Sequence, residues 1–134
     1  MPTLTPTLTL ASTDALSDEL NFTVTDSLSI TAPSVNLGTL VVDTTGANNI
    51  IVPANDNKQT WLFVRHTGTS DGTSTTSAHV DIELTGDVAI GALKSGEWLW
   101  FPHCGNGGST GIQLQAVGSA VQCEYGYWSD STAQ

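Results

Sequence analysis

The cysteines and histidines are the residues of this chain that could bind a metal ion or form a crosslink. His103 and Cys104 are adjacent, and Cys123 is the other cysteine. Adjacent side chains chelate one ion poorly, and the sequence contains neither a Cys-x-x-Cys nor a His-x-x-x-His spacing. We therefore predict no metal site and no cofactor. Two states remain open for the cysteines, either two buried free thiols or a disulfide between Cys104 and Cys123.

Residues suited to catalysis are few. His66 and His79 flank a Thr/Ser-rich stretch, residues 68–77, and could meet across a hairpin. The simpler interpretation is two polar residues at the base of an exposed, mobile loop. Asp81 and Glu83 share one strand face, as paired catalytic carboxylates would, but apolar residues alternate with them. A strand with one solvated face explains this pattern, and we predict that the chain is not an enzyme.

Four aromatic side chains could stack on sugar rings. Trp98 and Trp100 are two residues apart on one predicted strand, and so are Tyr125 and Tyr127 on another. Each pair therefore points to one side of its strand. Tryptophan and tyrosine are also favoured in a sandwich core or a subunit contact. We favour this structural interpretation and keep a carbohydrate-binding adhesin or receptor-binding module as an alternative function.

The spacing of the apolar residues predicts strands along the whole chain, and helix signals are nearly absent. From residue 4 to residue 30 the main apolar residues fall on even numbers, and Thr, Ser and Asn fill most odd positions. A period of two is the strand period. Leu4, Leu8 and Leu10 therefore share one face of an extended N-terminal β arm, residues 1–31, which could pair with another chain.

Turn signals about ten residues apart divide residues 32–134 into short strands, which favours an all-β, antiparallel β-sandwich, jelly-roll-like, over a parallel α/β fold. Both faces are apolar in Trp61-Leu62-Phe63-Val64 and in Trp98-Leu99-Trp100-Phe101. Such strands need a cover on both sides, from a second layer of the same subunit or from a neighbouring subunit. The predicted strands are Val35–Val42, Asn48–Val52, Gln59–Thr67, Ala78–Thr85, Val88–Leu93, Glu97–Phe101, Ile112–Val117 and Val121–Trp128.

The charge balance limits the partners. Three Lys and Arg residues stand against thirteen Asp and Glu residues, for a formal net charge of −10. Phosphates and anionic lipids should repel such a protein. Its apolar runs are too short to span a membrane, and Met1-Pro2-Thr3 does not begin a signal peptide. We expect neither a nucleic acid nor a membrane as partner, and synthesis in the cytoplasm.

A family resemblance enters with the C-terminal half. The stretch Trp61–Thr67 precedes a variable Thr/Ser loop, Val80–Leu84 follows, and Val121–Trp128 closes the domain. Between the last two stands the most telling segment, Leu93-Lys94-Ser95-Gly96-Glu97-Trp98-Leu99-Trp100-Phe101-Pro102. This order resembles small virion structural proteins of tailed bacteriophages, of the capsid decoration (cement) type and cyanophage-like. The resemblance implies a β-sandwich without catalytic residues.

Together these observations predict a decoration protein on the capsid exterior, made in the host bacterial cytoplasm. It would bind the major capsid protein or another virion protein, stabilise the shell, and assemble as a trimer or a dimer. A tail, neck or baseplate component of the virion is the closest alternative. The candidate protein-contact residues are Leu4, Leu8, Leu10, Trp98 and Trp100.

Overall fold

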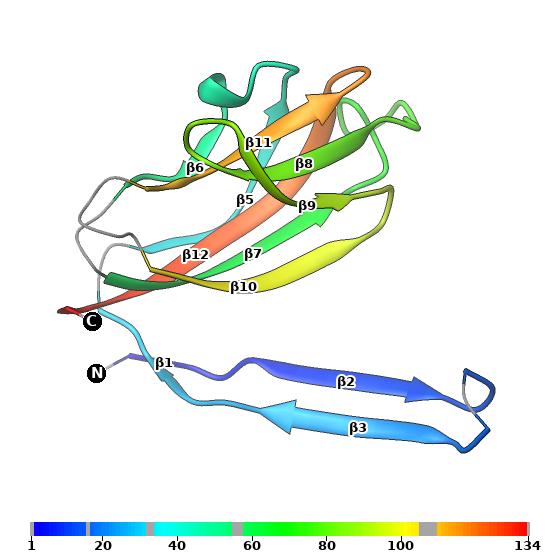
Figure 1. The fold of residues 1–134 in the computed structure, drawn as a ribbon, viewed down its shortest axis with the longest axis vertical. Helices are drawn as coiled ribbons and strands as arrows, with labels where there is room; N and C mark the ends of the chain where they lie inside the picture. Colours follow the sequence, from blue (N-terminus) through cyan, green and yellow to red (C-terminus); the bar gives the residue numbers. More distant parts are fainter. Residues whose placement is uncertain (1, 16, 32–33, 55–57, 105–109, 134) are drawn as a thin grey trace.

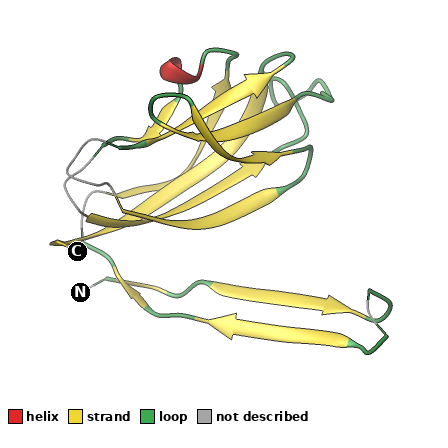
Figure 2. Ribbon diagram, viewed as in Figure 1, coloured by secondary structure: helices red, strands yellow, loops and turns green. Residues whose placement is uncertain are grey.

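Two four-stranded antiparallel sheets form a β-sandwich in the computed structural model, which describes residues 2–15, 17–31, 34–54, 58–104 and 110–133. Within these ranges the chain is all-β, and its one helical element is a single 3-10 turn, η1 (Gly46–Asn48) (Figure 2). The prediction of an all-β sandwich is confirmed. No helix in the described ranges is long and apolar enough to cross a membrane.

The two sheets are built from eight strands whose pairing is nested. The strand β5 pairs with β12, β6 with β11, β7 with β10, and β8 with β9, all antiparallel (Figure 1). The first sheet has the order β10 (Trp98–Cys104), β7 (Lys58–His66), β12 (Val121–Ala133), β5 (Ser34–Val42). The second sheet has the order β6 (Ile50–Val52), β11 (Ile112–Val117), β8 (His79–Leu84), β9 (Val88–Leu93).

All eight strands predicted after residue 34 are present, with ends that differ by a few residues. The strand β10 continues through Pro102, which is tolerated because β10 is an edge strand and proline has no N–H to donate. The strand β12 extends to Ala133, and the buried hydroxyls of Thr60 and Ser129 are 2.8 Å apart across it. The sequence also predicts turns over residues 53–57 and 105–108, of which residues 55–57 and 105–108 lie outside the described residues.

The core lies between the two sheets and follows the period of two. Leu62 and Val64 of β7 and Cys123 of β12 point inward from the first sheet, and Ile82 and Leu114 face them from the second. These side chains are at most 1% exposed. Burying an aliphatic side chain of this size stabilises a fold by roughly 1.5–3 kcal/mol, so this layer holds the two sheets together.

The N-terminal segment pairs with itself and is not a single extended strand. The strand β2 (Thr7–Ser12) pairs with β3 (Leu20–Thr25), and β1 (Thr3–Leu4) pairs with β4 (Leu28–Ser29). Pro6 interrupts the ladder because it cannot donate a hydrogen bond, although its carbonyl accepts one from the Asp26 N–H. The predicted boundary between 31 and 32 stays a prediction, since residues 32–33 lie outside the described ranges.

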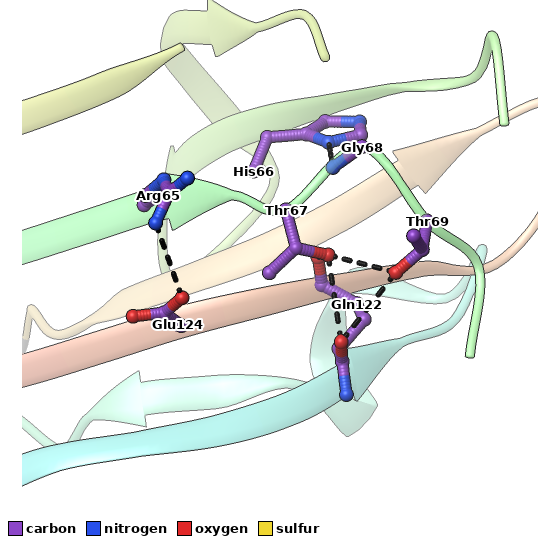
Figure 3. Close-up of polar contacts among 7 residues, drawn as sticks. All are labelled: Arg65, His66, Thr67, Gly68, Thr69, Gln122 and Glu124. Atoms are coloured by element: carbon purple, nitrogen blue, oxygen red, sulfur yellow. Dashed lines mark hydrogen bonds and ion pairs between the residues drawn. The ribbon is translucent and has the colours of Figure 1, made fainter. Parts of the chain in front are cut away.

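The loop over residues 68–77 is exposed along most of its length, as predicted, but it is held by hydrogen bonds (Figure 3). His66 is fully buried, and its Nδ1 accepts a hydrogen bond from the Gly68 N–H at 2.9 Å. The Gln122 N–H donates to the Thr69 carbonyl at 2.8 Å, and the Thr67 hydroxyl donates to the Gln122 carbonyl at 2.9 Å. The loop is therefore attached to the first sheet through β12.

Candidate functional site

The outer face of the first sheet carries a row of aromatic side chains, which we call the aromatic face. Trp98 and Trp100 of β10 point outward, and Leu99 and Phe101, which alternate with them, point to the core. In register, Trp98 lies beside Arg65, and Trp100 lies beside Phe63. The same alternation applies to β7. In both strands, therefore, one apolar face packs in the core and no second sheet covers the other. The aromatic face consists of Trp61, Phe63, Trp98, Trp100 and Trp128.

A groove of about 600 Å³ separates this aromatic face from the start of the N-terminal hairpin. Pro6, Thr7 and Leu8 form one wall. The opposite wall belongs to the first sheet, and Trp98 there is 52% exposed. Its residues are Leu37, Phe63, Arg65, Trp98, Trp100 and Trp128. The groove is therefore an apolar, solvent-facing site between two parts of one chain.

Gly126 makes room for the central aromatic pair. A Cβ at this position would lie 3.0 Å from the Trp128 ring and 3.2 Å from the Val35 carbonyl oxygen. The Trp128 ring lies 6.0 Å from the Trp100 ring, measured between centroids, with an interplanar angle of 34°. The Trp128 indole N–H donates to the Asn36 side-chain oxygen at 3.3 Å, which orients the ring.

Two opposite charges stand at one end of the aromatic face. Arg65 Nη1 lies 3.4 Å from Glu124 Oε1, and Arg65 is the neighbour of Trp98 in the ladder (Figure 3). Both side chains are partly exposed, so the pair adds little to stability. It cancels the local charge, however, and leaves the groove without a net charge from these two residues.

The hairpin β2–β3 carries an apolar stripe on one face, formed by Leu8, Leu10, Phe22 and Val24. Leu8 pairs with Val24, and Leu10 pairs with Phe22. Leu10, Phe22 and Val24 are 47–49% exposed. The other face carries threonines, whose hydroxyls lie 3.0 Å apart between Thr7 and Thr25. Among the described residues, no strand of either four-stranded sheet pairs with β2 or β3.

The structure brings together three of the five candidate contact residues. Leu8, Trp98 and Trp100 all line the groove. Leu10 lies further along the apolar stripe, towards the hairpin turn. Leu4 pairs with Leu28 in the short ladder beyond Pro6 and does not line the groove.

Tyr125 and Tyr127 do not belong to this site. They lie beside Val64 and Leu62 in the ladder, on the inner face of the first sheet. Burial raises the pKa of Tyr127 above its ordinary value, and the nearby Tyr125 acts in the same direction. The four aromatic residues considered for sugar stacking are therefore divided between the two faces of the first sheet, with the two tryptophans outside and the two tyrosines inside.

Six residues that line the groove were not predicted as site residues from the sequence: Pro6, Thr7, Leu37, Phe63, Arg65 and Trp128. Period two places Trp128 on the face opposite Tyr127, together with Gly126 and Glu124. That signal was present in the sequence. It did not say which of the two faces is the outer one.

The predicted cysteine and histidine alternatives are resolved in part. Cys123 is a buried free thiol, and desolvation raises its pKa to about 12. Cys123 pairs with His66 and Cys104 with Gln59, at opposite ends of β7. At about 3.3 Å per residue the two backbones are roughly 20 Å apart, so a disulfide between them is not possible.

His66 and His79 have different partners. His66 Nε2 lies 3.0 Å from the Ala78 carbonyl, and His79 Nε2 lies 3.5 Å from Asp81 Oδ1. The prediction of a solvated carboxylate face is wrong for Glu83, which is buried beneath the turn η1. Its Oε2 accepts a hydrogen bond from Gln113 Nε2 at 2.7 Å. In the described ranges no three His, Cys, Asp or Glu residues are grouped as a metal site would need.

The sequence also holds two Gly-x-Ser-x-Gly stretches, residues 68–72 and 107–111. A nucleophile elbow requires a strand, a sharp turn and a helix in that order. Ser70 instead lies in the loop between β7 and β8, with its hydroxyl 3.4 Å from the Ser74 carbonyl, and a strand follows the loop. The first three residues of the second stretch, 107–109, lie outside the described ranges.

No protein-family model, curated protein or solved structure matches this chain.

Proposed function

We propose that this protein is a capsid decoration (cement) protein of a tailed bacteriophage. It binds the major capsid protein on the capsid exterior and reinforces the shell, and it performs no catalysis. The sequence resemblance to small virion structural proteins suggests this role. The observation that carries it is the apolar stripe of the hairpin, which is exposed and has the form of a protein-binding element.

A two-stranded ribbon is marginally stable in water by itself, because it buries little apolar surface. Leu10, Phe22 and Val24 are about half exposed here, and strands β2 and β3 contain no ionisable side chain. Full burial of such a side chain contributes roughly 1.5–3 kcal/mol before ordering costs are subtracted. A protein surface that covers the stripe would therefore stabilise both the hairpin and the attachment.

The topology supports a jelly-roll fold within this proposal. The nested pairing of eight strands corresponds to one long antiparallel ribbon that is rolled into two sheets. Jelly rolls occur in viral capsid proteins and also in lectin domains. This support is an analogy of fold, and the exposed stripe remains the argument for the function.

The charge distribution favours a neutral or basic protein partner. The chain carries a net charge of −10, whereas the hairpin strands are uncharged. Hydroxyl groups, such as those of Thr7 and Thr9, cost less to desolvate than charged groups. Contact through the hairpin therefore brings no charge of β2 or β3 into the interface, while the negative charge of the rest of the chain attracts a basic partner and repels an acidic one.

Binding to capsids that lack this protein tests the proposal. The unaltered protein should co-sediment with such capsids and raise the temperature at which they disrupt. The double variant Leu10→Asp, Phe22→Asp should lose this binding and keep the melting temperature of the sandwich. The matched control is Val88→Asp, Ile90→Asp, which adds the same charge to exposed residues of β9.

Absence of capsid binding by the unaltered protein would contradict the decoration function. Binding to purified tails but not to capsids would favour a tail, neck or baseplate component. An equal loss in the hairpin variant and in the β9 control would show that added charge weakens binding anywhere on the surface, and the hairpin would lose its assigned role.

Carbohydrate binding is a second candidate because Trp98, Trp100 and Trp128 line a solvent-facing groove. Tryptophan rings offer flat apolar faces to a ligand. Titration with soluble glycans, followed by tryptophan fluorescence, would test this function. A saturable change in fluorescence that Trp98→Ala abolishes would favour an adhesin or receptor-binding module. No change in fluorescence with any of the glycans would contradict this function.

A further inference from the structure

We propose that the hairpin β2–β3 of one copy packs its apolar stripe on the aromatic face of a second copy, and that the second copy does the same in return. The result is a twofold dimer with two identical contacts. This inference goes beyond the proposed function: the second copy covers the stripe in solution, and the capsid protein takes its place on the stripe when the protein attaches to a particle. Its test uses purified protein without capsids, so that the two proposals can fail separately.

The two surfaces match in chemistry. The stripe presents aliphatic and aromatic side chains from a two-stranded ribbon, and the aromatic face presents flat rings over a four-stranded sheet. Both remain open to solvent in one copy, at Phe22 on the stripe and at Trp98 on the face. Each surface is of the kind that sheet-on-sheet packing normally covers.

One copy completes only the beginning of this contact. Leu8, next to the Pro6 interruption, reaches the groove and lies across from Trp98 and Trp100. Leu10 and Phe22 belong to the same stripe, and they stay exposed although the same chain offers an aromatic face. Figure 1 shows the hairpin running alongside the sandwich to a turn that projects past it. Exchange of such an element between copies is a low-cost route to a dimer.

The charges permit this contact and disfavour most others between two copies. Two chains of net charge −10 repel each other, and a contact formed by uncharged residues adds no close like-charge pair to that repulsion. Strands β2 and β3 have no ionisable side chain, and on the aromatic face Arg65 is paired with Glu124. The acidic residues of the hairpin lie in its turn, where Asp14, Asp18 and Glu19 are placed.

We choose a second copy as the occupant because it can cover both surfaces at once. Every chain carries one stripe and one aromatic face. In a dimer of two copies each stripe can therefore pack on the aromatic face of the other copy, and no stripe or face remains exposed. A contact in which surface A of one copy meets surface B of the other, and the reverse, closes around a twofold axis.

Sedimentation velocity at micromolar concentration measures the dimer directly. The unaltered protein should sediment at twice 14.0 kDa. Two variants, Leu10→Asp with Phe22→Asp on the stripe and Trp98→Ser on the face, should each weaken the dimer by roughly tenfold or more. The matched control Val88→Asp, Ile90→Asp should remain a dimer, and near-unchanged thermal melts should show that all sandwiches are folded.

Mixing the two defective variants gives the decisive result. The Trp98→Ser copy still has an intact stripe, and the hairpin variant still has an intact face, so together they can form one of the two contacts. We expect a mixed dimer that is weaker than the unaltered one and stronger than either variant alone. No recovery on mixing would overturn the reciprocal contact.

Two further outcomes separate this inference from the proposed function. A monomer that binds capsids would overturn the dimer and leave the decoration function standing, with the capsid protein as the cover of the stripe. If the protein forms a dimer with the expected mixing behaviour but does not bind capsids, the dimer is supported and the decoration function is contradicted. A monomer whose stripe is protected from solvent by its own aromatic face would also overturn the dimer.

Discussion

Trp100 and Trp128 face each other on the outer surface of the first sheet, with ring centroids 6.0 Å apart and planes inclined by 34°. They come from strands that are not neighbours, since β7 lies between β10 and β12. In the ladder row that holds Trp100, β7 contributes Phe63 and β12 contributes Gly126, which has no side chain. The small residue is therefore what lets a large ring extend across the sheet.

Gly126→Ala should displace the Trp128 ring. The added Cβ would lie 3.0 Å from that ring and 3.2 Å from the Val35 carbonyl, which is backbone and cannot move easily. We expect a loss of about 1–3 kcal/mol in the free energy of unfolding and a changed tryptophan emission spectrum. Gly91→Ala in β9 is the control, because its Cβ would meet no atom within 4 Å. Equal effects at both positions would contradict the crowding argument.

The buried hydroxyl pair of Thr60 and Ser129 should show strong coupling. Their oxygens are 2.8 Å apart and both residues are fully buried. Thr60→Val leaves the Ser129 hydroxyl without this partner and should cost about 1–3 kcal/mol of unfolding free energy. The double variant with Ser129→Ala should cost less than the sum of the two single variants. Chemical denaturation of the four proteins measures the coupling, and additive losses would show that the hydroxyls do not depend on each other.

The loop over residues 68–77 should lose order in acid. The backbone N–H groups of Ser74 and Thr73 donate to the Asp71 carboxylate and hold its pKa below the ordinary value of 3.8. A carboxyl group whose pKa is lowered in the folded state stabilises the fold at pH values above its ordinary pKa. This contribution disappears as the pH falls through the lowered pKa. Amide exchange at Thr73 and Ser74 should accelerate in that range, and Asp71→Asn should remove the pH dependence. The same acid response in both proteins would contradict this role of Asp71.

The Cys123 thiol should be inert while the protein is folded. Burial raises its pKa to about 12, so almost no thiolate forms near neutral pH. In a Cys104→Ser variant, which leaves one cysteine, alkylation should be slow in buffer and fast in denaturant. The labelling rate in buffer should follow the rate of opening of the sandwich. Rapid labelling of the folded variant would show that β12 is more accessible than the structure indicates.

The sequence alone determined the strands and the side of each strand on which a residue lies. Alternation in Trp98-Leu99-Trp100-Phe101 separates the tryptophans from the core residues, and the structure keeps that separation. The even-numbered leucines 8 and 10 likewise share a face of β2. Such patterns are local, because successive side chains of a strand point to opposite sides whatever the strand pairs with.

Only the tertiary structure decided which side is inside and which residues meet. Tyr127 and Trp128 are adjacent and point to opposite sides of β12. The alternation along the strand does not tell which of them enters the core. That choice follows from the pairing of β12 with β7 and β5, strands far away in the sequence. Glu83 is buried because η1 covers it. The N-terminal segment forms a hairpin because β2 pairs with β3, where Leu8 lies opposite Val24. These contacts join residues that are distant along the chain, so their energies appear only when the whole ribbon has folded.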